Sequence, residues 1–157
     1  MKRNIAIIGG GIAGLTFANC LSREDFEIHI YEKKPDFGEV GAAISVFPNA
    51  LCVMDEIGLL DQILENSGQF QNMYLKTYSG DTLSKTTPRS DYPVICTHRA
   101  DLHKTLLSGI NANLHKGIGV TQLENLDNGQ VKVSFDNDES SVFDAVIGAD
   151  GIHSVVR

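Results

Sequence analysis

Residues 4–14 read Asn-Ile-Ala-Ile-Ile-Gly-Gly-Gly-Ile-Ala-Gly, and this stretch decides the fold. Residues 4–8 are a short apolar run with charge before it and glycine after it, which is typical of a buried parallel strand. From residue 12 to residue 22 apolar residues recur at every third position, which predicts a helix. Residues 27–31 predict a second strand, so the stretch opens a βαβ unit of a Rossmann-like α/β fold with a parallel sheet.

Gly9, Gly11 and Gly14 satisfy the pattern G-x-G-x-x-G at this strand–helix junction. Gly9 permits the tight turn, Gly11 lets the backbone approach a pyrophosphate, and Gly14 lets the helix pack closely on the strand. The phosphates would meet free N–H groups and the positive end of the helix dipole. We count Ala13, in the same turn, with these cofactor-binding residues. A glycine-rich turn also forms for conformational reasons alone, so the pattern needs context.

Glu32 supplies that context at the end of the second predicted strand, about 18 residues after Gly14. A dinucleotide fold needs an acid there to accept a hydrogen bond from an adenosine ribose hydroxyl. The alternative is a solvent-exposed Glu paired loosely with Lys33 or Lys34. We interpret Glu32 as the ribose ligand, which disfavours a 2′-phosphate and hence NADP in this site. NAD and FAD both remain open at this point.

The C-terminal stretch points to the same edge of the sheet. Residues 145–149 are short and apolar, as a central parallel strand would be, and Asp150 and Gly151 follow directly. This strand and the first one would both end at the crevice where open α/β sheets bind ligands. Taken alone, an Asp-Gly pair is also an ordinary turn or helix cap.

The middle of the chain adds short helices and antiparallel strands around this parallel sheet. We expect a loop of small residues over 37–44 and a further strand over 94–96. The expected helices cover 48–58, 59–65 and, capped by Thr97, 98–108. The expected antiparallel strands are 70–78 with 82–87, 120–126 with 131–135, and 140–144.

Composition narrows the class of protein. The 157 residues contain 20 acidic and 13 basic side chains, for a net charge of −7, and 42% are apolar. This favours one folded domain over residues 1–157, with neither nucleic acid nor a membrane span as partner. We expect a cytoplasmic location and three reduced, mostly buried cysteines. The five histidines are scattered, so we expect no metal site, and no residue has the neighbours of an activated nucleophile.

The residues resemble the FAD-dependent, single-component aromatic-ring hydroxylases, a family of flavoprotein monooxygenases. The glycine turn with Glu32 and the terminal Gly-Ala-Asp-Gly-Ile-His-Ser-Val-Val-Arg are similar to two signatures of that family. Residues 41–44, 48–51 and 57–59 are similar to the segment that passes the flavin in the salicylate-hydroxylase-like branch. Residues 98–102 are similar to its helix start with a flavin-contacting Arg.

The resemblance implies a role for each matching residue. Gly9, Gly11 and Gly14 would hold the FAD pyrophosphate, and Glu32 the adenosine ribose. Arg99 would direct positive charge toward the phosphates or the ribityl chain, where the alternative is a surface Arg near a helix N-terminus. Asp150 would accept a hydrogen bond from a hydroxyl of the flavin chain, and Gly151 would keep the backbone close to it. The residues that would line the flavin are Ala42, Ala43 and Ile44, and the alternative for them is a structural loop.

In such enzymes NADH or NADPH reduces FAD, O2 forms a flavin hydroperoxide, and one oxygen atom enters a small aromatic or planar substrate. The cofactor carries this chemistry, so the resemblance assigns no catalytic side chain. Family members are considerably longer, and the resemblance implies an FAD-binding domain that is C-terminally incomplete. A second hypothesis is therefore a non-catalytic FAD-binding fragment without the substrate half. A flavin oxidase or reductase with the same first βαβ unit is a further alternative, and the sequence sets no expectation for the oligomeric state.

Overall fold

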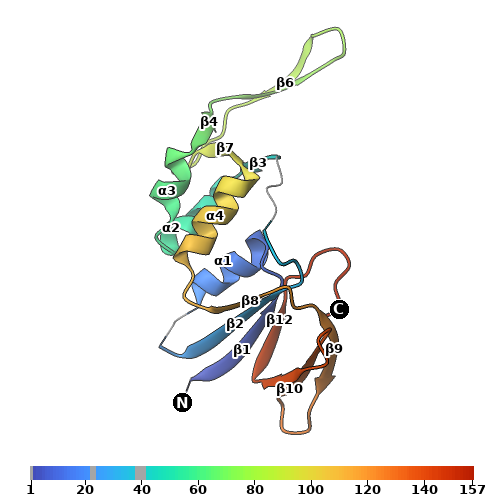
Figure 1. The fold of residues 1–157 in the computed structure, drawn as a ribbon. Helices are drawn as coiled ribbons and strands as arrows, with labels where there is room; N and C mark the ends of the chain where they lie inside the picture. The colour runs from blue at the N-terminus through green and yellow to red at the C-terminus, as the bar shows by residue number, and fades with distance from the viewer. Residues whose placement is uncertain (1, 22–23, 38–41) are drawn as a thin grey trace. The chain divides into compact units, whose positions relative to one another are not determined.

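The computed structural model describes residues 2–21, 24–37 and 42–157. Within these ranges the chain divides into two compact units (Figure 1). The first unit contains the described residues before 40 together with residues 106–157. The second unit contains the described residues from 42 to 105.

A four-stranded parallel sheet forms the centre of the first unit (Figure 1). Its strands, in spatial order, are β12 (Ala145–Gly148), β1 (Arg3–Ile8), β2 (Phe26–Glu32) and β8 (Asn113–Lys116). Helix α1 (Ile12–Cys20) connects β1 to β2, so the predicted βαβ unit is confirmed. The predicted fold class, a Rossmann-like parallel sheet with additional antiparallel strands, is confirmed as well.

The central strand β1 is buried on both faces. Its successive side chains point to opposite faces of the sheet, and each face is covered. Ile7 faces α1, where its side chain lies next to Gly14. Ala6 and Ile8 face the other way and share a cluster with Tyr31 of β2. Two buried faces explain why the strand is an almost continuous apolar run rather than an alternating one.

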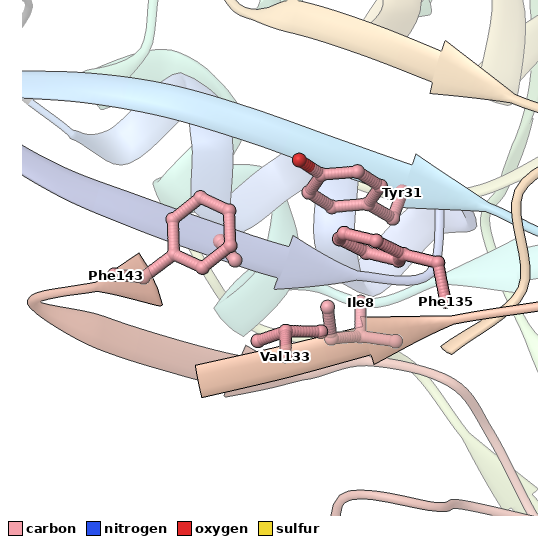
Figure 2. Close-up of a cluster of buried hydrophobic side chains, with 6 residues drawn as sticks. Ile8, Tyr31, Val133, Phe135 and Phe143 are labelled. Atoms are coloured by element: carbon pink, nitrogen blue, oxygen red, sulfur yellow. The ribbon is translucent and has the colours of Figure 1, made fainter. Parts of the chain in front are cut away.

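A three-stranded antiparallel sheet contributes the other half of that cluster. Its strands, in spatial order, are β11 (Ser140–Phe143), β10 (Val131–Phe135) and β9 (Val120–Asn125). Figure 2 shows Val133, Phe135 and Phe143 packed with Ile8 and Tyr31. The turn between β9 and β10 places Gly129 at a φ of +83°, a conformation that glycine adopts freely, as the predicted hairpin requires.

The second unit combines helices with short antiparallel strands. Its helices are α2 (Pro48–Glu56), α3 (Leu60–Glu65) and the first part of α4 (Arg99–Gly109). One sheet has the order β3 (Ala43–Val46), β7 (Val94–His98), β4 (Ser67–Phe70). A separate hairpin pairs β5 (Met73–Lys76) with β6 (Thr82–Thr86). The helices predicted from residues 48 and 59 onward are thereby confirmed.

Several local predictions for this unit are wrong because strand pairing extends further than the sequence pattern indicates. Thr97 does not cap α4, because it lies in β7 and pairs with Ile44 of β3. Its hydroxyl donates to the backbone carbonyl of Asn66 at 3.2 Å. Ala43 and Ile44 lie in β3 rather than in a loop, while residues 38–41 fall outside the described ranges. Phe70 belongs to β4 and pairs with β7, so it is no part of the predicted hairpin.

Other departures concern burial and a strand that the pattern does not predict. The expectation of mostly buried cysteines is wrong, because Cys20 and Cys52 are exposed and Cys96 is half-buried. The two exposed cysteines lie on the solvent-facing sides of their helices. Strand β8 was not predicted, since an edge strand with one apolar residue gives little periodic signal. The helix predicted to reach residue 22 ends at Cys20, and residue 22 itself lies outside the described ranges.

None of the helices within the described ranges has the length and apolar character needed to cross a membrane.

We predict that Gly14→Ala destabilises the protein. A Cβ at Gly14 would collide with the backbone carbonyl oxygen of Gly9, which cannot rotate away. Overpacking of this kind costs about 1–3 kcal/mol, more than the gain of about 1 kcal/mol from the better helix propensity of Ala. Urea unfolding followed by circular dichroism measures the difference in unfolding free energy.

The control is Gly11→Ala, because a Cβ at Gly11 meets no atom within 4 Å. Its only cost is a poorer helix N-cap, about 1 kcal/mol or less. Equal stability of the Gly14→Ala variant and the wild-type protein would contradict the close packing of α1 on β1.

Candidate functional site

The turn between β1 and α1 brings three backbone segments to one point. Gly9 has a φ of +109°, and a Cβ there would collide with the carbonyl oxygen of Ala149, just after β12. A Cβ on Gly14, in α1, would in turn collide with the carbonyl oxygen of Gly9. Gly10 lies against the ring of Phe37, which a Cβ would approach to 2.8 Å. These glycines are therefore required by packing.

Gly11 differs from its neighbours because the space in front of it is open. A Cβ built on Gly11 meets nothing within 4 Å. Gly11 is also the N-cap of α1, and among the described residues no side chain caps this end and no acidic residue lies in its first turn. The first N–H groups of the helix and its positive dipole end are thus left uncompensated beside open space. Such an end can bind an anion.

Glu32, at the end of β2, is held in place by two backbone N–H groups. Gly10 donates to Oε2 at 2.9 Å, and Lys34 donates to Oε1 at 3.0 Å. Each carboxylate oxygen keeps a further lone pair for another donor. The alternative was a loose ion pair between Glu32 and a lysine ammonium group. The contact with Lys34 is instead a hydrogen bond from its backbone N–H.

Asp150 follows β12 and organises the turn after it. Its Oδ2 accepts from the backbone N–H of Val155 at 2.6 Å and of Val156 at 3.4 Å. Its Oδ1 is buried and has no hydrogen-bond partner within the described part of the chain. Next to it, Gly151 has a φ of +81°, which disfavours any other residue. The Asp-Gly pair therefore forms a turn cap, as one of the alternatives held, and leaves one carboxylate oxygen unsatisfied.

The pKa of Asp150 reflects this environment. Burial raises the pKa of the carboxyl, but hydrogen bonds from the Ser154 side chain and the Val155 backbone lower it by more. The net result is a pKa below the ordinary value of 3.8, so the group is ionised at neutral pH.

These residues surround one pocket of about 230 Å³ in the first unit. Five of the predicted cofactor-binding residues line it: Gly9, Gly11, Glu32, Asp150 and Gly151. Ala13 and Gly14 are not among the lining residues; Ala13 is exposed and Gly14 is buried in the helix–strand contact. The volume lies below the roughly 300 Å³ at which pockets for whole small ligands begin. The pocket therefore suits one part of a dinucleotide.

The sequence did not identify several other lining residues. They include Tyr31, Lys33, His153 and residues 118–120; Ile8, Ala149 and Val155 line the pocket as well. Residues 118–120 follow the unpredicted strand β8, so no periodic signal connects them to the glycine turn. Tyr31 and Lys33 flank Glu32, and that adjacency is the one signal that could have found them.

The other four predicted residues lie in the second unit, where the structure brings them together. Ala43 and Ile44 are in β3, paired with His98 and Thr97 of β7. The backbone N–H of Arg99, at the start of α4, donates to the carbonyl of Ala42 at 2.9 Å. Two segments more than fifty residues apart thus meet, and their contact with FAD stays a prediction.

Two of the histidines are not scattered, contrary to expectation. His29 Nδ1 lies 3.0 Å from His115 Nε2, because β2 and β8 are neighbouring strands that the sequence did not pair. Across the described residues, no group of three or more His, Cys, Asp or Glu is placed to hold a metal ion.

Comparison with known proteins supports a nucleotide-binding fold. Residues 7–54 match a family model described as an NAD(P)-binding Rossmann-like domain. The chain is 32% identical over 161 residues to a 3-amino-4-hydroxybenzoate 2-monooxygenase from Streptomyces cremeus, covering 98% of this chain and 41% of that protein. It is also 32% identical over 163 residues to a 6-hydroxynicotinate 3-monooxygenase from Pseudomonas fluorescens, covering 98% and 42%.

Solved structures agree with this relationship. A 2-methyl-3-hydroxypyridine-5-carboxylic acid oxygenase superposes with a TM-score of 0.87 at 25% identity, covering 99% of this chain and 41% of that one. A tetracycline destructase superposes with a TM-score of 0.78 at 26% identity, covering 100% and 41%. The chain thus spans about two fifths of the length of the relatives it matches.

We predict that the turn after Asp150 titrates with its carboxyl. Because the folded pKa is lowered, the hydrogen bonds to Oδ2 persist above 3.8 and are lost as the pH falls through the folded pKa. NMR should show the Val155 amide proton shifting with a midpoint below 3.8, and Asp150→Asn should remove that transition. A midpoint at or above the ordinary value would contradict the role of Asp150 as a turn cap.

Proposed function

The chain is related over nearly its whole length to FAD-dependent monooxygenases, as the sequence motifs predicted, and from this premise we propose that its first unit binds FAD. The observation that carries the proposal is the open space in front of Gly11, beside the uncapped end of α1 and between two carboxylates. Packing leaves that space empty although glycine is not needed there for any backbone contact. A ligand that approaches the backbone explains it.

The charges around the pocket sort the parts of the cofactor. The pyrophosphate would lie at Gly11, where the N–H groups and dipole of α1 favour an anion. A ribose hydroxyl would donate to Glu32, whose carboxylate is already oriented by Gly10 and Lys34. Because a second anion near Glu32 would be repelled, a 2′-phosphate, and hence NADP, is disfavoured here.

The remaining predicted residues would contact the flavin side of the cofactor. Asp150 has one unsatisfied oxygen, Oδ1, that can accept from a hydroxyl of the flavin chain if the turn opens slightly to expose it. Gly151 keeps the backbone close. In the second unit, Arg99 would supply positive charge, and the exposed Ala42 and Ala43 with the half-buried Ile44 would offer a small-residue surface to the flavin.

Bound FAD would supply the redox chemistry: reduction by NADH or NADPH, then reaction with O2 and hydroxylation of a small aromatic or planar substrate. The relatives' names support that class, since they include monooxygenases of hydroxybenzoate and hydroxynicotinate compounds. The residues of this chain would bind and orient the cofactor, and we assign none of them a proton transfer.

The alternative function is FAD binding without turnover. What supports it is that the residues lining the pocket offer contacts to a nucleotide, while none of them is assigned a proton transfer. Bound flavin with no substrate-stimulated oxidation of NADH or NADPH would support this alternative and contradict activity in the chain as given.

The primary test is to refold the purified chain with FAD, remove free flavin by gel filtration, and record the visible spectrum. We expect a yellow protein with the absorption bands of bound flavin, near one flavin per chain. Protein that remains colourless would contradict the proposed function.

We further predict that Gly11→Val abolishes FAD binding without unfolding the protein. The Val side chain would fill the space proposed for the pyrophosphate, yet it meets no protein atom at the Cβ position. Flavin fluorescence titration measures the affinity, and urea unfolding checks the fold.

The matched control is Cys20→Val, which adds bulk at the exposed, opposite end of the same helix. It should bind FAD like the wild-type protein. Wild-type affinity in Gly11→Val would refute the placement of the pyrophosphate.

A further inference from the structure

His29 and His115 form a hydrogen-bonded pair that the proposed function does not use. His29 Nδ1 and His115 Nε2 are 3.0 Å apart, and the two rings are nearly parallel, at 10°, with centroids 5.3 Å apart. Since the nitrogen atoms are much closer than the centroids, the rings meet at their edges. One ring must then donate an N–H and the other accept it, so at most one of the two can be charged while the bond exists.

The pair connects an edge strand to the wall of the nucleotide pocket. His115 lies on β8 and stacks on Tyr31, with ring centroids 4.5 Å apart, and Tyr31 lines the pocket. Immediately after β8, the backbone N–H of Ile118 donates to the carbonyl of Glu32 at 3.1 Å. Residues 118–120 then form part of the pocket wall. A displacement of β8 would therefore disturb the stack of His115 on Tyr31 and move this wall.

Few other charges face the pair. On β2, Glu27 Oε1 lies 3.6 Å from His29 Nε2, on the exposed side, and can stabilise one positive ring. On β11 the neighbour of His29 is the apolar ring of Phe143, and Glu139, just before that strand, acts on Tyr31.

The lysines of the neighbouring strands do not face the pair. Lys116 of β8 pairs with Asp36 at 3.5 Å, and Lys132 of β10 alternates with the buried Val133 and so points away. Among the residues that the structure describes, one carboxylate can offset one charged ring, and no second one faces the pair.

We propose that the His29–His115 pair is a proton-sensitive latch on the nucleotide pocket, which holds β8 in place at neutral pH and releases it when both rings are protonated. The proposal rests on FAD binding in this pocket and adds a means of regulating it. In acid, two charged rings replace the donor–acceptor bond, β8 moves away from β2, and the wall at residues 118–120 loosens. FAD affinity then falls.

The direction of the pH effect follows from the burial of the pair. Burial lowers the pKa of His115 from its ordinary value of 6.5, and His29 lowers it further. A histidine with a lowered folded pKa destabilises the closed state as the pH falls below 6.5, because the open state takes up the proton more readily.

The test measures FAD affinity of the refolded chain by flavin fluorescence from about pH 7.5 to about pH 5.5, the range in which histidine titrates. We expect the dissociation constant of the wild-type protein to rise by about five- to tenfold over that range. In His29→Gln, whose amide can still bond to His115 without a second charge, the rise should fall to less than about twofold. His115→Phe, which keeps the stack on Tyr31, should flatten the profile as well.

His153→Gln is the discriminating control, because His153 is a histidine that lines the pocket but lies outside the pair. This variant should keep the pH dependence of the wild-type protein, whatever its affinity near neutral pH. In FAD-free protein, NMR of the imidazole nitrogens should show the hydrogen bond between His29 Nδ1 and His115 Nε2 at neutral pH and its loss in acid.

Three results would overturn the proposal: a wild-type affinity that does not change with pH, a wild-type profile preserved in both pair variants, or a profile flattened by His153→Gln instead. In each of these FAD still binds, so the proposed function stands. Absence of FAD binding at every pH would overturn the proposed function and this inference with it.

Discussion

The first unit depends on a contact between backbones that leaves no room for side chains. A Cβ on Gly14 would collide with the carbonyl oxygen of Gly9, and a Cβ on Gly9 would collide with the carbonyl oxygen of Ala149. Strand β1, helix α1 and the end of β12 are thus fixed at one point by atoms that cannot rotate away. The same contact places the N-terminus of α1 next to the end of β12, so the packing of the fold and the shape of the pocket have one cause.

The pocket is organised by backbone N–H groups more than by side-chain pairs. Gly10 and Lys34 hold the carboxylate of Glu32, while Val155 and Val156 hold that of Asp150. Both carboxylates are therefore oriented before any ligand arrives, which reduces the entropy lost on binding. Two negative groups and one positive helix end divide the pocket into a place for hydroxyl donors and a place for a phosphate. This division of charge is the physical basis of the proposed FAD site.

Sequence patterns predicted the parts of the molecule that depend on local periodicity. The βαβ unit and the hairpin of β9 and β10 were found because burial on two faces or a glycine turn leaves a clear signal. Strand β8 was missed because Asn113, His115 and Lys116 give an edge strand no apolar alternation. The His29–His115 contact was missed for the same reason, since it exists only if β8 pairs with β2. Thr97 was misassigned because its local pattern suits a helix cap, whereas pairing with β3 and β4 keeps it in a strand.

The choice of FAD over NAD rests on residues outside the glycine turn. The family model covers residues 7–54 and is described by NAD(P) binding, because a glycine turn followed by an acid serves the adenosine half that both cofactors share. Only the other half of the cofactor differs, so residues that distinguish the two must lie elsewhere. The monooxygenase relatives align over 98% of the chain, through Asp150 and through the two segments that Arg99 and Ala42 join. Similarity that extends to those residues supports a flavin cofactor. Similarity confined to the first βαβ unit would support FAD and NAD equally well.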